Sequence, residues 1–512
     1  MVVTRQTFWR WYVGGIAAWF ALASSFGLSP TRAADSAATS TTNKTSHTRS
    51  TKKTSRRTRP RSKPVPLDAL DPVPIETREG NPLGTFFQAL ANLATPSADA
   101  SAPPVVRIIH FGDSHVASDY WAGVLREKLQ ERFGDAGPGF VLPGRPWNSI
   151  RYADAESLDG KGWRTDGLRV GENDGVVGLG GMSTESFRET EPASALASFS
   201  QFDIFAATSP ASNCLQVQVD EADFHDLTSD TQPVIPSPPA PSPVVPEPSS
   251  KSLGGGAADP PVPMVQPTAA KRKKKKRRKA TPPEPPFKPW PADSPLDLLD
   301  LTNSAPLATG PHRISVRSSC GSTARLLGLE LYSGAKGVLY DTDGVNGARL
   351  ADLEKPLPAL RKTLLQKSHP ALIIVSYGTN DIGMKGFTSS EYEEKAFQIL
   401  SKLKEDAGDA SILVTGPTDR GSPRKKTRAL IQAGQSALQP ALRKAALRAG
   451  CAYWDQQAAM GGPGVMTRWV RAGLANYDYV HFSGLGYKKL ADMLYDQLMA
   501  EYSKFQKTEI PQ

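Results

Sequence analysis

Short apolar runs that alternate with helical patterns constrain the fold of this chain more than any other feature. The runs at 105–111 (VVRIIHF), 371–377 (ALIIVSY) and 411–415 (SILVT) have the length and β-branched content of buried strands, and a fourth strand is expected at 336–340. Segments with apolar residues at three- and four-residue spacing accompany these runs. The helices that they predict span 85–93, 121–133, 350–365, 388–405 and 487–505. Continuous apolar strands joined by helices predict an α/β domain built on a doubly wound parallel sheet.

A second pattern, typical of antiparallel sheets, lies between the first of these strands and the later ones. Apolar and polar residues alternate at 215–219 (LQVQV), 314–317 (ISVR) and 327–331 (LGLEL), and Gly, Ser and Pro separate these runs. We therefore expect a β-sandwich inserted over residues 166–335.

A long proline-rich segment interrupts this predicted sandwich at residues 230–303. Of the 44 prolines in the chain, 19 fall between Pro233 and Pro295. A loop of this length and composition cannot bury a core, so we expect it to be disordered. The α/β domain is then expected in two parts, at 81–165 and 336–508.

Residues 1–34 have the pattern of an export signal. Arg5 and Arg10 precede an apolar stretch at 11–28, and small residues follow it. We therefore expect an exported protein of the periplasm or cell envelope, with an uncleaved membrane anchor as the alternative use of the same stretch. Residues 35–80, rich in Ser, Thr, Pro and basic residues, are predicted to form a disordered arm.

The net charge of +10 comes from two basic runs outside the predicted domains. Lys44–Lys63 and Lys271–Lys279 each contain nine basic residues and no acidic residue, so the rest of the chain is net acidic. A nucleic-acid-binding protein is expected to carry its basic residues on a folded face, so we expect no nucleic-acid partner. Lys271–Lys279 is either a solvated linker or an anchor to an anionic envelope polymer or membrane surface.

Four short blocks contain residues suited to acyl transfer. Ser114 lies in GDSH (112–115) directly after the first strand, and Asn380 lies in YGTND (377–381) after the most apolar strand. Gly347 lies in GVNGA (344–348), and Asp478 and His481 lie in DYVH (478–481) before the last helix. A serine becomes a nucleophile when a base removes its proton and a third group fixes that base. Because strand ends of a parallel sheet meet at one edge, these blocks are expected to lie close together.

Each block has an ordinary structural explanation when it is taken alone. Gly-Asp-Ser is common in turns, Asn and Asp are common helix caps, and an Asp-x-x-His pair occurs often by chance. Asp341 and Asp343 suggest a calcium loop, but the spacing of the EF-hand loop fails after them. We therefore predict no metal and no cofactor.

Together and in this order, the four blocks resemble those of the SGNH (GDSL-like) hydrolase family. The resemblance covers roughly 104–150 and 336–505, and it implies a flavodoxin-like three-layer α/β/α fold without a metal. It also implies the role of each residue. Ser114 would be the nucleophile, His481 the base and Asp478 its orienting partner, while the Ser114 N–H, Gly347 and Asn380 would form the oxyanion hole.

Two features leave the details of this resemblance open. His115 stands where many family members carry leucine, which makes the substrate class less certain. Gly180-Gly181 is a rival glycine block for the oxyanion hole, although it lies in the sandwich-like part of the sequence.

The position of the β-rich insertion resembles the arrangement in bacterial peptidoglycan O-acetylesterases. This similarity implies an exported serine esterase that removes short acyl groups, such as O-acetyl groups, from an envelope polysaccharide such as peptidoglycan. An acylated polysaccharide is then the expected partner. One alternative is a polysaccharide O-acetyltransferase with the same triad. Another is a non-catalytic glycan-binding envelope protein.

Overall fold

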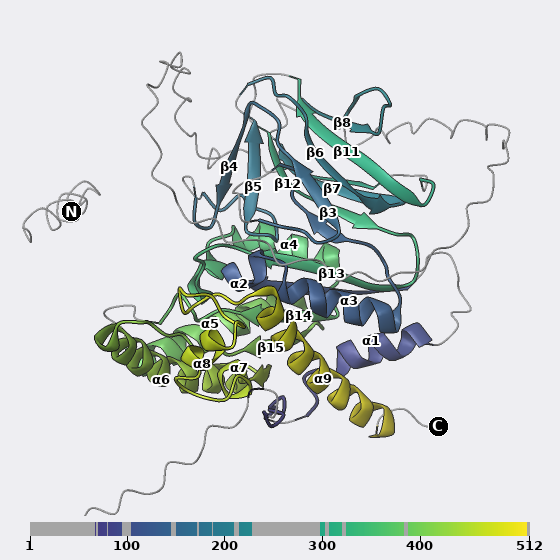
Figure 1. The fold of residues 1–512 in the computed structure, drawn as a ribbon. Coiled ribbons are helices and arrows are strands. Elements are labelled where there is room, and N and C mark those ends of the chain that lie inside the picture. Colours follow the sequence, from purple (N-terminus) through teal and green to yellow (C-terminus); the bar gives the residue numbers. More distant parts are fainter. Residues whose placement is uncertain are drawn as a thin grey trace, which may run out of the picture. The chain divides into compact units, whose positions relative to one another are not determined.

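The computed structural model describes residues 67, 70–78, 80–94, 104–144, 150–170, 174–186, 188–208, 214–227, 297–302, 307–319, 324–382 and 388–508 (Figure 1). The predicted signal at 1–34 and the run Lys271–Lys279 lie outside these residues. No helix in the described ranges has an apolar stretch long enough to cross a membrane.

A parallel sheet of five strands forms the centre of the α/β part. Its order is β13 (Gly337–Gly344), β1 (Val105–Gly112), β14 (Leu372–Ser376), β15 (Ser411–Thr415) and β16 (Ala452–Trp454). Numbered along the chain this is the order 2-1-3-4-5 of flavodoxin-like folds. The predicted fold class is thus confirmed.

Helices cover both faces of this sheet because successive strand residues point to opposite sides (Figure 1). Ile108 and Ile374 join a core cluster with α1 (Gly84–Ala94), α3 (Trp121–Phe133) and α9 (Gly484–Thr508). Ile109 and Ile373 join a second cluster on the other face, with η1 (Leu350–Glu354), α4 (Pro358–Ser368), α5 (Ser389–Ala407) and α6 (Lys425–Arg448). Two short helices, α7 (Gln456–Ala459) and α8 (Met466–Arg471), precede α9.

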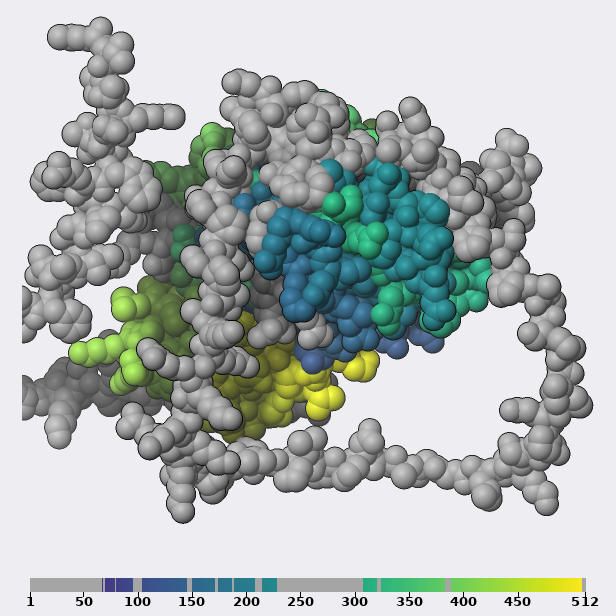
Figure 2. All heavy atoms as spheres, turned by 90° about the horizontal axis from the view of Figure 1, so that it is seen from above, coloured from purple at the N-terminus to yellow at the C-terminus, as the bar shows by residue number. Residues whose placement is uncertain are grey.

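Two antiparallel sheets pack face to face over an apolar core of their own (Figures 1 and 2, teal). The first has the order β10 (Asp297–Thr302), β7 (Gln201–Thr208), β12 (Arg325–Tyr332), β5 (Met182–Ser186) and β4 (Trp163–Gly167), with β2 (Gly139–Val141) also paired to β12. The second has the order β3 (Ala155–Leu158), β6 (Ala193–Phe199), β11 (Gly310–Ser318), β8 (Leu215–Val219) and β9 (His225–Asp226).

The strands of these sheets do not follow the boundaries expected from the sequence. Strands β2 and β3 come before residue 166 and β4 begins before it, so the antiparallel region starts earlier than predicted. Strand β10 lies inside the segment 230–303 that was expected to be disordered, and its backbone pairs with β7 from Asp297 to Thr302. That expectation is wrong for these six residues, because an open edge of a sheet orders any extended segment that can pair with it. Residues 231–296 lie outside the described part.

The predicted boundary of the disordered arm, 35–80, is also wrong, because residues 70–78 are ordered. Glu76 exchanges two backbone hydrogen bonds with Tyr453, of 2.7 and 2.9 Å, and Trp454 Nε1 donates to the Val73 carbonyl. The side chain of Ile75 is buried in the first core cluster. Residues 70–78 are therefore held against β16, a long-range contact that local composition does not reveal.

Two helical segments differ from the sequence prediction. The expected helix 350–365 is two helices, η1 and α4, because Pro356 and Pro358 interrupt the backbone between them. Proline lacks an N–H and disfavours helical geometry in the residue before it, yet it suits the first turn, where Pro358 lies. The long helix α6 was not expected, since it is polar and contains Pro440.

The three strands that lead to the blocks with Ser114, Gly347 and Asn380 end at one level. Gly112 of β1 pairs with Gly344 of β13 and with Ser376 of β14, so the residues after these strands emerge at one edge. The contact at Gly344 is very close. A Cβ built there would lie 2.0 Å from the backbone nitrogen of Ala117, in the short helix α2 (Ser114–Ala117).

Asp381 is a buried carboxyl in the turn after β14. It is 2% exposed, and burial raises its pKa to about 7 from the ordinary 3.8, although the N–H of Leu350 donates to it and opposes the shift. The folded protein therefore keeps Asp381 protonated at pH values where the unfolded chain ionises it. The stability that results is full below pH ~4 and is lost as the pH rises towards 7.

We expect Gly344→Ala to destabilise the protein by at least ~2 kcal/mol, because backbone atoms cannot move aside for the new methyl group. Gly484→Ala is the matched control, since no described residue outside its own stretch of α9 comes within 4 Å of a Cβ at Gly484. Thermal unfolding measures both variants. Equal melting temperatures for the two variants would contradict the close approach of β13 to α2.

We expect Asp381→Asn to flatten the decline in stability between pH 5 and 8, because the replacement cannot ionise. The wild-type decline due to this carboxyl is on the order of 2 kcal/mol. The measurement is the free energy of unfolding at both pH values, with Asp409→Asn as the control at an exposed carboxylate. The prediction fails if Asp381→Asn and wild type lose the same stability over this range.

Candidate active site

Ser114 is presented by the turn between β1 and α2. The side chain of Asp113 caps α2 by accepting from the His115 N–H at 2.9 Å, which fixes the turn around Ser114. Ser114 is the first residue of α2, a position whose N–H has no partner within the helix. The Ser114 side chain is partly exposed, and its Oγ lies 2.8 Å from His481 Nε2.

Asp478 holds both His481 and the loop that carries it. Its Oδ2 lies 2.7 Å from His481 Nδ1, while its Oδ1 accepts from the N–H groups of Val480 and His481. Tyr479 between them has a φ of 61°, which lets the loop fold back over three residues. Although partial burial opposes ionisation, the hydrogen bonds from His481 and these N–H groups hold the pKa of Asp478 below its ordinary value. The carboxylate therefore accepts the Nδ1 proton and leaves Nε2 to accept from Ser114.

The ring of His115 packs against the imidazole of His481. The two rings lie 5.3 Å apart, and His115 Nδ1 is 3.0 Å from the hydroxyl of Tyr487 in α9. Burial lowers the pKa of His115 to about 3, and the neighbouring His481 adds to this shift. His115 is therefore neutral, and it packs against His481 as an aromatic side chain.

Asn380 and Gly347 lie on neighbouring loops of the same edge. Asn380 Nδ2 donates to the Ala348 carbonyl at 3.0 Å, which ties the turn after β14 to the loop after β13. Gly347 has a φ of 75°, and only Arg169 Nε, among the described residues outside its own chain neighbours, comes within 4 Å of a Cβ built on it. The space beside Gly347 is thus open.

The rival block Gly180-Gly181 has a different environment. A Cβ at Gly180 would meet Phe140 at 2.7 Å, and one at Gly181 would meet Leu168 at 2.7 Å and Val345 at 2.9 Å. These glycines allow close packing between an antiparallel sheet and the end of β13. They do not border the open space beside Gly347.

Two arginines beside these loops carry no recognisable sequence signal. Arg420 Nη1 donates to the Thr379 carbonyl at 3.0 Å, and Arg349 Nε donates to the Asn380 carbonyl at 3.2 Å. Two consecutive carbonyls of the turn after β14 are therefore each held by a guanidinium group. Both arginines come from loops, where spacing patterns do not predict position.

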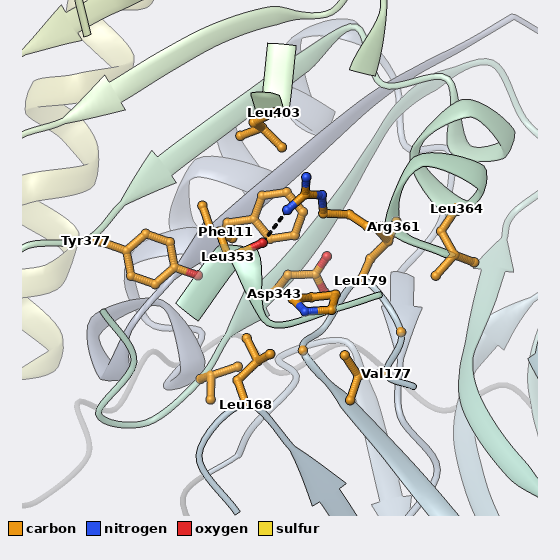
Figure 3. Close-up of a pocket in the computed structure, with 14 residues that line it drawn as sticks. Phe111, Leu168, Val177, Leu179, Asp343, Leu353, Arg361, Leu364, Tyr377 and Leu403 are labelled. Atoms are coloured by element: carbon orange, nitrogen blue, oxygen red, sulfur yellow. Dashed lines mark hydrogen bonds between the residues drawn. The ribbon is translucent and has the colours of Figure 1, made fainter. Parts of the chain in front are cut away.

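A small cavity lies beneath the strand ends, on the face of the sheet towards α5 (Figure 3). Its volume of about 20 Å³ is room for a water molecule. Asp343 of β13 lines it, and both of its carboxyl oxygens are buried without a hydrogen-bond partner. Burial raises the pKa of Asp343 well above its usual range, and the nearby carboxyls of Asp341 and Glu330 add to this shift. Leu168, from the turn after β4, forms part of the opposite wall.

The chemistry that this edge allows is attack by an activated serine. The ordered chain Asp478, His481, Ser114 provides a nucleophile with a base and an orienting carboxylate. Among the described residues, no group of three or more His, Cys, Asp or Glu side chains is arranged to hold a metal ion.

Comparison with known proteins gives a family match and several structural likenesses. Residues 308–489 match the model of the GDSL-like Lipase/Acylhydrolase family. This segment contains Gly347, Asn380, Asp478 and His481, while Ser114 comes earlier in the chain. Comparison with curated proteins gives no match.

The solved structure "Peptidoglycan O-acetylesterase in action, 5 min" has a TM-score of 0.55 and 22% identity, over 83% of this chain and 97% of its own. At that identity the likeness establishes the fold. A lipase/acylhydrolase from Enterococcus faecalis matches 32% of this chain and 78% of its own, with 19% identity and a TM-score of 0.26. An acetyl xylan esterase matches 31% of this chain and 80% of its own, with 16% identity and a TM-score of 0.25.

The family match and the shared fold agree with the four blocks of the sequence. The match of residues 308–489 supports a carboxylic ester hydrolase of the SGNH (GDSL-like) type, and the fold of the chain resembles that of a peptidoglycan O-acetylesterase.

Proposed function

We propose that this protein is an exported serine esterase that removes O-acetyl groups from an envelope polysaccharide, with peptidoglycan as the first candidate. The hydrogen-bonded chain from Ser114 through His481 to Asp478 carries the proposal. Serine, imidazole and carboxylate at 2.8 and 2.7 Å are the groups needed to attack an ester without a cofactor.

In the first half of the reaction, Ser114 Oγ attacks the acetyl carbonyl carbon and its proton passes to His481 Nε2. The tetrahedral intermediate collapses, the bond to the sugar oxygen breaks, and His481 returns the proton to that oxygen. In the second half, His481 takes a proton from water as the water attacks the acetyl-serine. Acetate leaves, Ser114 regains its proton, and Asp478 stabilises the imidazolium in both halves.

The Ser114 N–H, the Gly347 N–H and Asn380 Nδ2 are the proposed donors to the oxyanion. They belong to the three loops that follow β1, β13 and β14, and those strands end at one level. In this structure Asn380 Nδ2 donates to the Ala348 carbonyl, which keeps the amide beside Gly347. Donors fixed before the reaction stabilise developing charge without reorganisation.

A polysaccharide substrate is supported by the antiparallel sheets, which add a second surface to the α/β domain. We propose them as an inserted β-sandwich that binds the sugar chain. The fold shared with a peptidoglycan O-acetylesterase makes peptidoglycan the first polymer to test. The apolar stretch at 11–28 supports export to the periplasm or envelope, and the run Lys271–Lys279 suits contact with an anionic envelope polymer or membrane surface.

Ser114→Ala is expected to lower ester hydrolysis by about 10⁴–10⁶ while the protein stays folded, because the nucleophile is lost and only a hydrogen bond to His481 goes with it. The measurement is acetate release from O-acetylated peptidoglycan and turnover of 4-nitrophenyl acetate, with thermal unfolding as the check of folding. Near-normal turnover in folded Ser114→Ala would overturn the assignment of the nucleophile. Acetylated xylan and long-chain lipid esters complete the panel, and a preference for lipid esters would overturn the proposed substrate.

Asn380→Ala is expected to lower kcat by about 10²–10³ with little change in KM, because an oxyanion donor acts chiefly in the transition state. Asn380→Asp is a useful second variant, since it keeps the size of the side chain but replaces the donating amide by a carboxylate. A rise in KM at constant kcat would instead make Asn380 a binding residue.

A further inference from the structure

Arg169 belongs to the antiparallel region but lies at the edge of the parallel sheet that carries Ser114, Gly347 and Asn380. We call this edge the catalytic edge. Arg169 lies in the tight turn after β4, where Gly167 N donates to the Val170 carbonyl at 3.0 Å and Val170 N donates back at 3.3 Å. The main chain of this turn is thus closed on itself.

Three contacts fix this turn, and two of them are made with the α/β part. Leu168 N donates to the Gly181 carbonyl at 3.0 Å, and the Leu168 carbonyl accepts from Lys355 Nζ at 2.6 Å. The Leu168 side chain is buried on the wall of the cavity beneath the strand ends (Figure 3). Arg169 therefore extends from a rigid support.

The guanidinium of Arg169 borders the open space beside Gly347. Its Nε lies 4.0 Å from the position of a Cβ built on Gly347. The group is therefore on the side-chain face of this glycine, while the proposed oxyanion donor is the Gly347 N–H. Arg169 is placed to contact a substrate group next to the scissile ester.

The guanidinium of Arg169 makes only a long ion pair with the described residues of the protein. Its ion pair with Asp352 is long, at 3.7 Å, and 37% of its side chain is exposed. Asp352 has closer partners, since Lys355 Nζ lies at 2.9 Å and Arg349 N donates to it at 2.8 Å. Arg349 and Arg420, by contrast, donate directly to backbone carbonyls.

We propose that Arg169 binds a carboxylate of the acylated polysaccharide beside the ester that is cleaved. This inference rests on the proposed function and narrows its substrate class to a sugar polymer that carries carboxylates. A guanidinium presents paired N–H groups that match the two oxygens of a carboxylate, and an anchored turn lowers the entropy lost on binding. The antiparallel region would thus select the substrate at the catalytic edge itself.

The test compares wild type with Arg169→Ala, Arg169→Lys and the control Arg132→Ala, which removes the same charge from an exposed position on α3 of the α/β part. One substrate pair is O-acetylated peptidoglycan with its carboxyls free or converted to amides. The other pair is soluble: 4-acetoxybenzoate and its methyl ester. The measured quantity is the ratio of kcat/KM for the carboxylate form to that for the neutral form.

We expect wild type and Arg132→Ala to prefer the carboxylate form. Arg169→Ala should lower this ratio about tenfold, mainly through KM, as loss of a charge-assisted hydrogen bond does. Arg169→Lys should keep part of the preference, because the charge remains without the paired donors. High salt should shrink the wild-type preference.

An unchanged ratio in Arg169→Ala would overturn the inference. So would an equal loss of kcat on both forms, since the guanidinium would then act on the oxyanion or on the Gly347 loop. A different result would overturn the proposed function: a folded Ser114→Ala variant that still hydrolyses the ester. If wild type releases no acetate from peptidoglycan but hydrolyses the soluble esters through Ser114, the soluble pair decides the role of Arg169.

Discussion

The close contact between the end of β13 and the backbone of α2 sets the geometry on which the catalytic edge depends. Gly344 permits this approach because a Cβ would overlap Ala117 N. Strands β13, β1 and β14 consequently end level, with Gly112 paired to both Gly344 and Ser376. The loops with Ser114, Gly347 and Asn380 then open at one edge, and distances of 3 Å between their donors and acceptors become possible. A shift of one residue in this register would move each loop by about 3.3 Å and separate the donors.

The antiparallel sheets are joined to this parallel sheet through buried polar contacts. Arg107 of β1 pairs with Glu330 of β12 at 2.8 Å and donates to the Tyr332 hydroxyl at 2.8 Å, while Phe140 N donates to Asp341 of β13. Burial raises the pKa of Glu330, so removing these groups from water is costly. Such a pair contributes little net stability, but an alternative packing that left its members unpaired would cost several kcal/mol. The network thus favours one placement of the antiparallel region against β1 and β13.

Local patterns in the sequence were sufficient to predict the parts of the structure that local interactions determine. The strand 411–415 and the helix 121–133 match β15 and α3 residue for residue, and the helix expected from 388 is α5, which Thr388 caps together with Glu391. Motif spacing singled out the residues that the structure brings together, since three motifs follow a strand of the parallel sheet and the fourth precedes α9. Long-range pairing was not visible in this way. Residues 70–78 and 297–302 have the composition of linkers, and partners far away in the chain order them.

The arginines around the site are also placed by long-range contacts that local sequence patterns do not predict. Arg349 and Arg420 hold two consecutive carbonyls, so their effect on Asn380 passes through the backbone and leaves no motif. Arg169 reaches Gly347 from a different sheet, on a turn fixed by Lys355 and Gly181. Because the same turn also buries Leu168 in the core beneath the strand ends, the antiparallel region cannot move away from the catalytic edge without opening that core. Leu168 and Val345 belong to one core cluster, so the turn that carries Arg169 and the loop that carries Gly347 are held together by packing, which keeps the guanidinium beside the glycine.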